Sequence, residues 1–145
     1  MSLSRSERRE VVVRSFLYLH TGDVAATRRF YSELLGLDEI VASDKVVGYR
    51  IGTLQLTIAK HEDARMGEGW SQQLGWTGGA SASPSFGLEV ADEQFANVVG
   101  RLRAASTLSW SDEPTWVGYW SFPVADPMGN TMEVSAVGSD AWPSA

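Results

Sequence analysis

The sequence of 145 residues contains one pattern of strands and a helix twice, and this internal repeat restricts the fold more than any single segment does. The first copy opens with an apolar and aromatic run over 11–20, typical of a strand. Asp23 follows as a good helix N-cap, and Gly36 is placed to end the helix. Three short strands are predicted at about 38–43, 46–51 and 54–59. The helix between the first strand and these three has an apolar stripe of Val24, Phe30, Tyr31, Leu34 and Leu35.

The second copy starts at a strand over 86–90 and continues with Asp92, which is placed to cap a second helix. Strands are predicted near 107–111, 118–125 and 130–137. Aligning Asp23 with Asp92 superposes strand on strand and helix on helix, and the second copy is nine residues longer, around 111–118. We therefore predict an α+β fold of two tandem βαβββ modules, whose curved mixed sheets surround a cup. The second helical stripe consists of Phe95, Val98, Val99 and Leu102.

These elements predict an N-terminal arm at 1–10, one domain over 11–137 and a tail at 138–145. Within the domain, module one spans 11–60 and module two spans 84–137. The connection over 60–83 is rich in glycine and ends in a Ser-Pro cluster, which is typical of a loop. The arginines of the arm are interrupted by Glu7 and Glu10, and we expect the arm to be solvated.

Composition excludes several classes of function. The absence of cysteine excludes disulfides, thiolate metal sites and cysteine nucleophiles. A net charge of −6 argues against a nucleic-acid partner or an anionic membrane surface. No apolar run reaches the roughly 20 residues that cross a bilayer, and the N-terminus lacks the apolar stretch of a signal peptide. We expect a soluble, cytoplasmic protein.

Strand alternation predicts which side chains face the helices and which line the cup. The apolar set of the last strands, with Leu56 and Val134 at its centre, is predicted to pack beneath the helices. The opposite face is polar and aromatic, as expected of a surface that holds a ligand. Its members are Phe16, Tyr18, His20, Gln55, Thr57, Ser85, Gly87, Glu89, Thr131, Glu133 and Ser135.

Three stretches carry a resemblance to a known family. Asp23 is followed by Phe30-Tyr31 and by Leu-Leu-Gly-Leu at 34–37, Gly-Leu-Glu-Val-Ala-Asp occupies 87–92, and Asp-Pro-Met-Gly-Asn-Thr-Met-Glu occupies 126–133. Over nearly the whole chain the pattern resembles the glyoxalase/bleomycin-resistance/dioxygenase (vicinal oxygen chelate) superfamily. The stretch at 126–133, similar to a DPxGNxxE signature, is the most specific part.

Enzymes of that superfamily hold a divalent metal through His and Glu side chains in the first and last strands of each module. The resemblance places Phe16, Gln55, Ser85 and Glu133 at these positions. A phenyl ring cannot bind a metal, a serine hydroxyl is a poor ligand, and an amide oxygen suits only hard cations. We therefore expect no metal and no other cofactor. The alternative is a relocated site that combines Glu133 with His20 or His61.

The resemblance to metal-free, bleomycin-resistance-type members implies a homodimer that sequesters an antibiotic-like molecule in aromatic-lined grooves. The acidic net charge favours a cationic small organic ligand, and the richness in Trp and Tyr favours a planar, aromatic one. No catalytic residue is predicted. Two other hypotheses remain. One is a metal-dependent, lactoylglutathione-lyase-like lyase or isomerase, or a dioxygenase, with a non-standard site, and the other is a structural or regulatory dimer without a ligand. The predicted ligand-binding residues are Phe16, Tyr18, His20, Gln55, Ser85, Trp110, Trp116, Trp120 and Glu133.

Overall fold

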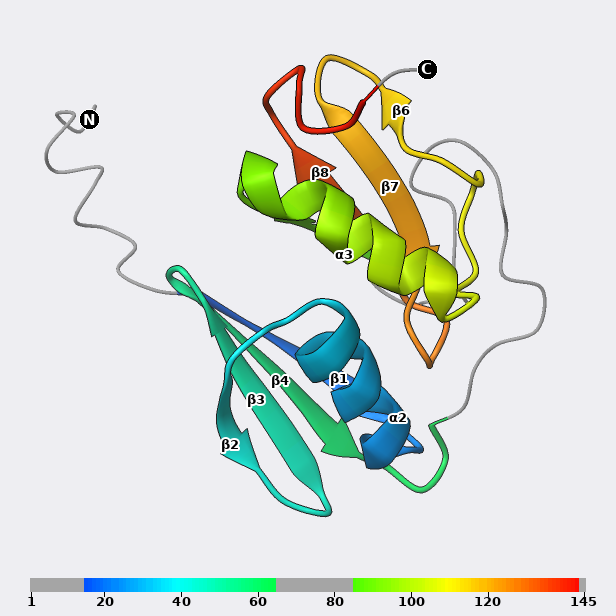
Figure 1. Cartoon of the computed structure of the whole chain (residues 1–145). Helices are drawn as coiled ribbons and strands as arrows, with labels where there is room; N and C mark the ends of the chain where they lie inside the picture. The colour runs from blue at the N-terminus through cyan, green and yellow to red at the C-terminus, as the bar shows by residue number, and fades with distance from the viewer. Residues whose placement is uncertain (1–14, 65–84, 144–145) are drawn as a thin grey trace, which may run out of the picture.

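The computed structural model describes residues 15–64 and 85–143. The predicted arm at 1–10, the first residues of the predicted first strand at 11–14, and most of the predicted connection lie outside the described residues. Module one has the predicted order of elements (Figure 1). They are β1 (Ser15–Thr21), α2 (Val24–Arg28), η1 (Arg29–Leu34), β2 (Glu39–Ala42), β3 (Val46–Ile51) and β4 (Leu54–Lys60).

Module two repeats this order and forms its own sheet. The first sheet has the order β1-β4-β3-β2 and the second the order β5-β8-β7-β6. In each sheet the first strand runs parallel to the last, and the other neighbours are antiparallel. The prediction of an α+β fold with two tandem modules is confirmed. The elements of module two are β5 (Ser85–Glu89), α3 (Asp92–Ala104), β6 (Thr115–Trp116), β7 (Trp120–Ala125) and β8 (Thr131–Ala136).

The first helical segment begins as predicted and then widens. The Asp23 carboxylate accepts a hydrogen bond of 3.0 Å from the backbone of Ala26, as an N-cap does. After Arg28 the helix continues as the π-helix η1, in which the amide of Leu35 bonds to the carbonyl of Phe30. Gly36 ends it with φ of +76°, a conformation that glycine adopts without steric cost.

The second helix departs from the prediction at its cap. The predicted stripe of α3 is buried throughout. Its N-cap, however, is Ala91, which has no capping side chain, so the prediction of Asp92 as the cap was wrong. The Asp92 carboxylate instead accepts a 3.0 Å hydrogen bond from the backbone of Gly138 and so holds the segment after β8.

The second strand of module two is also different from the prediction. Instead of a strand over 107–111, the structure has an isolated bridge between Ser109 and Val124 and the two-residue β6. Within this segment the hydroxyl of Ser109 donates to the carbonyl of Ser111, and a further turn follows. Such local bonds compete with the ladder, and Pro114 has no N–H to donate. These features explain the interrupted strand.

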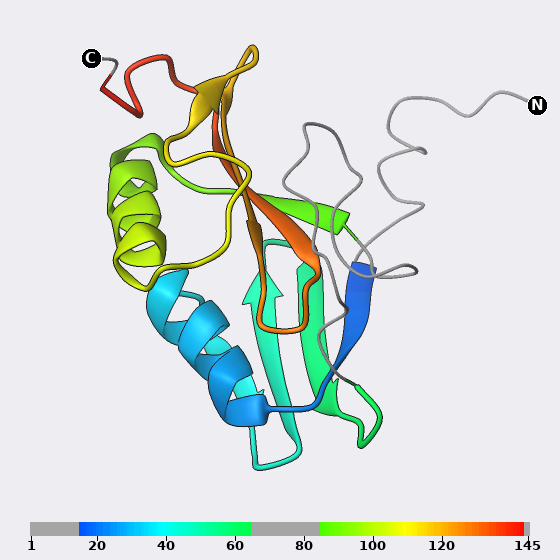
Figure 2. The same cartoon turned by 90° about the vertical axis from the view of Figure 1, so that its right-hand side faces the viewer.

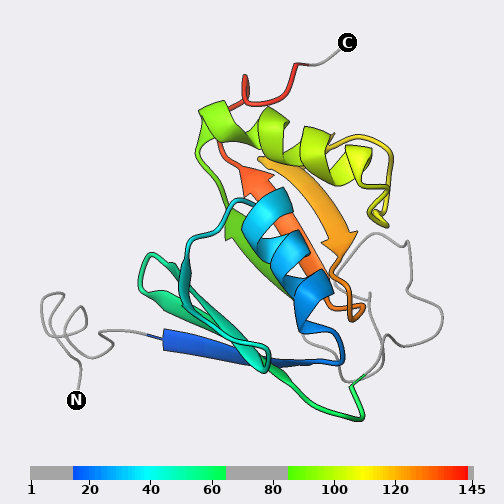
Figure 3. The ribbon, with the colours of Figure 1, turned by 60° about the horizontal axis from the view of Figure 1, so that its bottom comes forward.

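Each helical segment covers one face of its own sheet (Figures 1 and 3). The hydrophobic core lies between the helical segments and the sheets. The residues predicted to face inward, Leu56, Ile58, Met132 and Val134 among them, are buried as expected. Figure 2 shows the helices of both modules on one side of the strands, and the other side of each sheet carries no helix. The predicted cup-lining residues lie on that uncovered side.

The modules are joined through their helices and through the loop before β8. The guanidinium Nε of Arg101 donates a 2.8 Å hydrogen bond to the carbonyl of Leu34, and the Tyr31 hydroxyl donates one to Asp126. In the tail, Trp142 packs edge-on against Phe95 with a centroid distance of 6.2 Å. None of the helices in residues 15–64 and 85–143 is long and apolar enough to cross a membrane.

Candidate ligand-binding faces

Strand register places a row of three different side chains across the uncovered side of module one. Phe16 on β1 lies opposite Gln55 on β4, and Gln55 lies opposite Arg50 on β3. Phe16 is 74% exposed, and Tyr18, two residues further along the same side, is 54% exposed. We call the residues Phe16, Tyr18, Gln55, Thr57 and Arg50 the module-one face.

The polar members of this face differ in how far they are engaged. The side-chain amide of Gln55 donates a 3.2 Å hydrogen bond to the hydroxyl of Thr57, which leaves the Gln55 carbonyl oxygen for another donor. Arg50 is exposed and makes no ion pair or hydrogen bond with a side chain in the described part of the chain. Arg50 was not predicted as a site residue, although its alternation with the inward-facing Tyr49 indicates this side of the sheet.

His20 lies at the end of β1, where it stacks on His61 with a centroid distance of 4.9 Å. The Tyr18 ring meets His20 edge-on at 5.5 Å. The Nδ1 atom of His61 accepts a 3.2 Å hydrogen bond from the backbone of Asp63, so this nitrogen is not free to bind a metal in this arrangement. The structure therefore brings three aromatic rings together at this end of β1.

Glu133 is the centre of the corresponding side of module two. It lies between Gly87 on β5 and Pro123 on β7, and only 9% of its surface is exposed. Its Oε2 atom accepts a 2.9 Å hydrogen bond from the hydroxyl of Ser121 and a weaker one of 3.4 Å from Tyr119. Burial, and then the nearby Glu133 carboxylate, raise the pKa of the Tyr119 hydroxyl, which therefore stays protonated as a donor.

The second carboxylate oxygen, Oε1, has no partner among the described residues. A Cβ atom built on Gly87 would lie 3.8 Å from this oxygen, so the glycine leaves room beside it. We call Gly87, Tyr119, Ser121 and Glu133 the module-two face.

The register changes which residue of module two corresponds to Phe16. Phe16 lies opposite Gln55, and Gly87, rather than the predicted Ser85, lies opposite Glu133. Ser85 pairs with Thr131 at the start of β5. The difference arises because five residues of β1 follow Phe16, whereas only two residues of β5 follow Gly87. Aligning the helix caps therefore pairs Phe16 with Ser85 instead of Gly87.

The three predicted tryptophans do not lie together on this face. Trp120 is buried in the core, where its Nε1 donates to the carbonyl of Ser139, and Trp116 packs edge-on against it. Their register puts both on the side of α3, away from Glu133. Trp110 lies beside Pro123, to which its backbone bonds, in the row that contains Glu133. Its indole Nε1 is buried without a hydrogen-bond partner among the described residues.

The residues that the resemblance and the strand register place at the superfamily's metal positions do not fit a divalent ion. The row of module one offers one amide oxygen from Gln55, and that of module two offers the carboxylate of Glu133. A phenyl ring and a glycine occupy the two remaining positions, and neither supplies a donor. Residues 15–64 and 85–143 contain no group of three or more His, Cys, Asp or Glu side chains placed to hold a metal.

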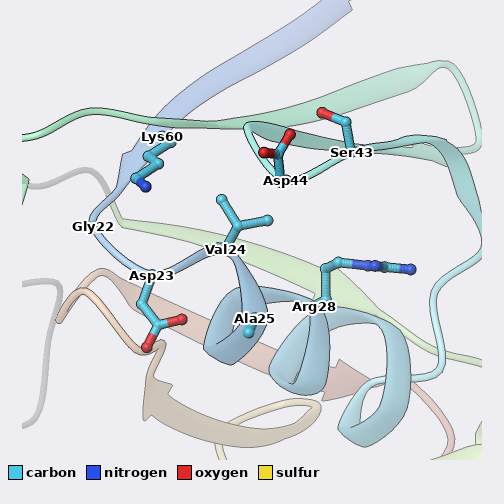
Figure 4. A pocket seen from close by; sticks show the side chains of 8 residues that line it. All are labelled: Gly22, Asp23, Val24, Ala25, Arg28, Ser43, Asp44 and Lys60. Carbon is cyan, nitrogen blue, oxygen red and sulfur yellow. The ribbon is translucent and has the colours of Figure 1, made fainter.

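A pocket of about 400 Å³ lies elsewhere, between the start of α2, the turn after β2 and the end of β4 (Figure 4). Lys60 and Asp44 line it with opposite charges, and Asp23 is already engaged as the helix cap. Arg28 is paired with Glu39 at 2.8 Å. None of the predicted ligand-binding residues lines this pocket.

Comparison with known proteins supports the fold. No protein-family model matches the sequence, and no curated protein matches it. The structure is similar to that of a glyoxalase/dioxygenase from Nostoc punctiforme, with a TM-score of 0.68 and 17% identity over 94% of this chain and 96% of that one. It is also similar to lactoylglutathione lyase from Agrobacterium tumefaciens, with a TM-score of 0.57 and 16% identity over 92% and 98% of the two chains.

A third similar structure is the fosfomycin resistance protein FosX from Mesorhizobium loti, with a TM-score of 0.61 and 12% identity over 90% of this chain and 95% of that one. At these identities the likeness shows the fold and not the activity. The chain has the fold of the vicinal oxygen chelate superfamily, which confirms the resemblance carried by its sequence motifs.

Proposed function

We propose that this protein binds a small planar organic molecule on its uncovered sheet faces without the help of a metal. The observation that supports the proposal most is the content of the two rows that run through Gln55 and Glu133. The resemblance puts Phe16 at a position where the superfamily's enzymes have a metal ligand, and strand register puts Gly87 in the corresponding row of module two. The aromatic ring provides contact area for an organic molecule, and the glycine provides space for one.

The polar atoms of module two support direct contact with the ligand. Glu133 keeps one carboxylate oxygen without a partner, and Trp110 keeps one buried indole N–H without a partner, among the described residues. The buried indole N–H of Trp110 costs about 1–3 kcal/mol while it has no partner, and a ligand that accepts its hydrogen bond recovers this cost. The proposal assigns Glu133 as the acceptor for a donor or cationic group of the ligand, and Trp110 as a donor.

The exposure of module one supports a second part of the proposal, a homodimer. A small-molecule site buries about 70–90% of its ligand. In one chain Phe16 is 74% exposed and Tyr18 54% exposed, so this face alone gives only one wall of such a site. A second copy of the chain would supply the opposite wall. Sedimentation velocity tests this part: Tyr18→Ser should shift the protein towards monomer, and Leu108→Ser, at a site on module two that is 47% exposed, should not.

Ligand binding is tested with protein dialysed against a chelator and shown by elemental analysis to hold no metal. Ligand-observed NMR then measures binding of bleomycin and of 2-substituted naphthalenes with cationic, neutral and anionic groups. We expect at least one of these probes to bind the metal-free protein. For a probe with a cationic or hydrogen-bond-donating group, Glu133→Gln should weaken binding about tenfold or more, because a hydrogen bond to a charged group contributes about 1.5–3 kcal/mol.

The matched control is Glu93→Gln, which removes an exposed carboxylate from α3 and should leave binding unchanged. Binding that disappears on chelation and returns with Ni²⁺, Zn²⁺, Fe²⁺ or Mn²⁺, together with turnover of a substrate, would favour the lyase, isomerase or dioxygenase hypothesis. Dimerisation with no binding of any probe would favour the structural dimer.

A further inference from the structure

The only arginine or lysine side chain on the uncovered side of the described strands of module one is Arg50. Lys60 on β4 is five residues from Gln55, so strand alternation puts it on the helix side of the sheet, beside α2. Arg28 is paired with Glu39. No carboxylate pairs with Arg50 in the described part of the chain. The net charge of the chain is −6, yet the unpaired charge on this face is positive.

The neighbours of Arg50 define what could bind beside it. Gln55 lies next to it in the row. Its amide nitrogen donates to Thr57, and its carbonyl oxygen has no partner among the described residues. Phe16 lies one strand further, roughly 10 Å from Arg50 at about 4.8 Å per strand. A planar ring with an acidic group spans this row, because the ring packs on Phe16 and Tyr18 while the acidic group reaches the guanidinium.

From this row we propose that the module-one face selects an aromatic carboxylate. The inference rests on the proposed small-molecule binding and specifies the chemical class of its ligand. The guanidinium of Arg50 presents a planar fork that matches a carboxylate with two parallel hydrogen bonds. One unpaired cation on the face balances a monoanion, which favours a carboxylate over a phosphate dianion.

The experiment uses three naphthalene probes with the same ring and different charge: 2-naphthoate, 2-naphthamide and 2-naphthylmethylamine. Their affinities for the metal-free, full-length protein are measured by NMR titration, with amide shifts in β1, β3 and β4 to locate them. We expect 2-naphthoate to bind at least tenfold more tightly than the other two. Arg50→Gln should remove this preference, and Arg50→Lys should retain part of it, because a lysine keeps the charge but not the fork.

The control is Arg103→Gln, which removes an exposed arginine of α3 and should leave all three affinities unchanged. Thermal melts confirm that each variant is folded. Equal binding of the three probes, an unchanged affinity of Arg50→Gln for 2-naphthoate, or binding of another molecule with none of the naphthalenes would each overturn the selection by Arg50. These results leave metal-independent binding intact, whereas binding that requires a metal removes that proposal and this inference together.

Discussion

The hydroxyl of Tyr31 donates a 2.7 Å hydrogen bond to Oδ2 of Asp126, 95 residues further along the chain. Tyr31 is buried in the π-helix of module one, and Asp126 is buried at the start of the loop that leads to β8. Oδ1 of the same carboxylate accepts from the backbones of Met128 and Asn130, and Oδ2 also accepts from the Asn130 side chain. The acidic residue of the DPxGNxxE signature therefore shapes its own loop and joins it to the other module.

Removing the Tyr31 hydroxyl should destabilise the protein by about 1.5–3 kcal/mol, because it deprives a buried carboxylate of a donor. Burial raises the pKa of Asp126, while the bond from Tyr31 and those within the loop act against the rise. Tyr31→Phe should therefore raise this pKa further. Urea denaturation measures the free energy of unfolding, and NMR titration of the carboxyl carbon measures the pKa.

The matched control is Tyr49→Phe, since Tyr49 is also buried but its hydroxyl bonds to the neutral Ser32 at 2.7 Å. That variant should cost only about 0.5–1.5 kcal/mol. A loss for Tyr31→Phe no larger than the loss for Tyr49→Phe would show that the contact between the modules adds little to stability.

The fold could be predicted from the sequence where local pattern and tertiary packing agree. The stripe from Phe95 to Leu102 and the alternation around Leu56 and Val134 both reflect burial, and both were confirmed. The π-helix could not be predicted, because a stripe of apolar residues does not distinguish an α-helical turn from the wider turn of a π-helix. The interrupted second strand of module two depends on side-chain hydrogen bonds of Ser109 and Ser111, which strand propensity does not describe.

The candidate site depends on register, which the sequence supplied only in part. Phe16, Gln55 and Glu133 were placed on the correct side by alternation. Gly87 replaced Ser85 in the row of Glu133 because the two first strands have different lengths, and cap alignment does not detect that difference. Trp116 and Trp120 were predicted because aromatic residues cluster around the nine additional residues of module two, and strand pairing put both on the helix side.

Two glycines with different backbone geometry should respond to alanine in opposite directions. Gly36 has φ of +76°, and Gly36→Ala should cost about 1–2 kcal/mol because a side chain is strained there. Gly100 lies inside α3, and a Cβ there would meet no atom within 4 Å. Gly100→Ala should stabilise the protein by about 0.5–1 kcal/mol. Equal effects in urea denaturation would contradict the assigned helix end at Gly36.

The Arg28–Glu39 pair should make stability depend on acid pH. Hydrogen bonds from Arg28 and Ser32 lower the pKa of Glu39 from 4.5 to about 2. Because the folded pKa is below the unfolded one, the stabilisation is present above pH 4.5 and is lost as pH falls through about 2. The urea midpoint of wild type should exceed that of Glu39→Gln at pH 6, and the difference should shrink towards pH 2. A difference that does not vary with pH would exclude the carboxylate as its source.

Gly87→Ala should separate ligand binding from stability. The added methyl group would meet Glu133 at 3.6–3.8 Å, which is ordinary contact, and Gly87 does not have a positive φ. Alanine in a strand is therefore expected to raise the free energy of unfolding by up to about 1 kcal/mol. The same methyl group occupies the space beside Oε1 of Glu133, so the probe that binds wild type should bind this variant more weakly. A variant that is more stable and binds equally well would mean that the ligand does not use this oxygen, and the role proposed for Glu133 would then be wrong.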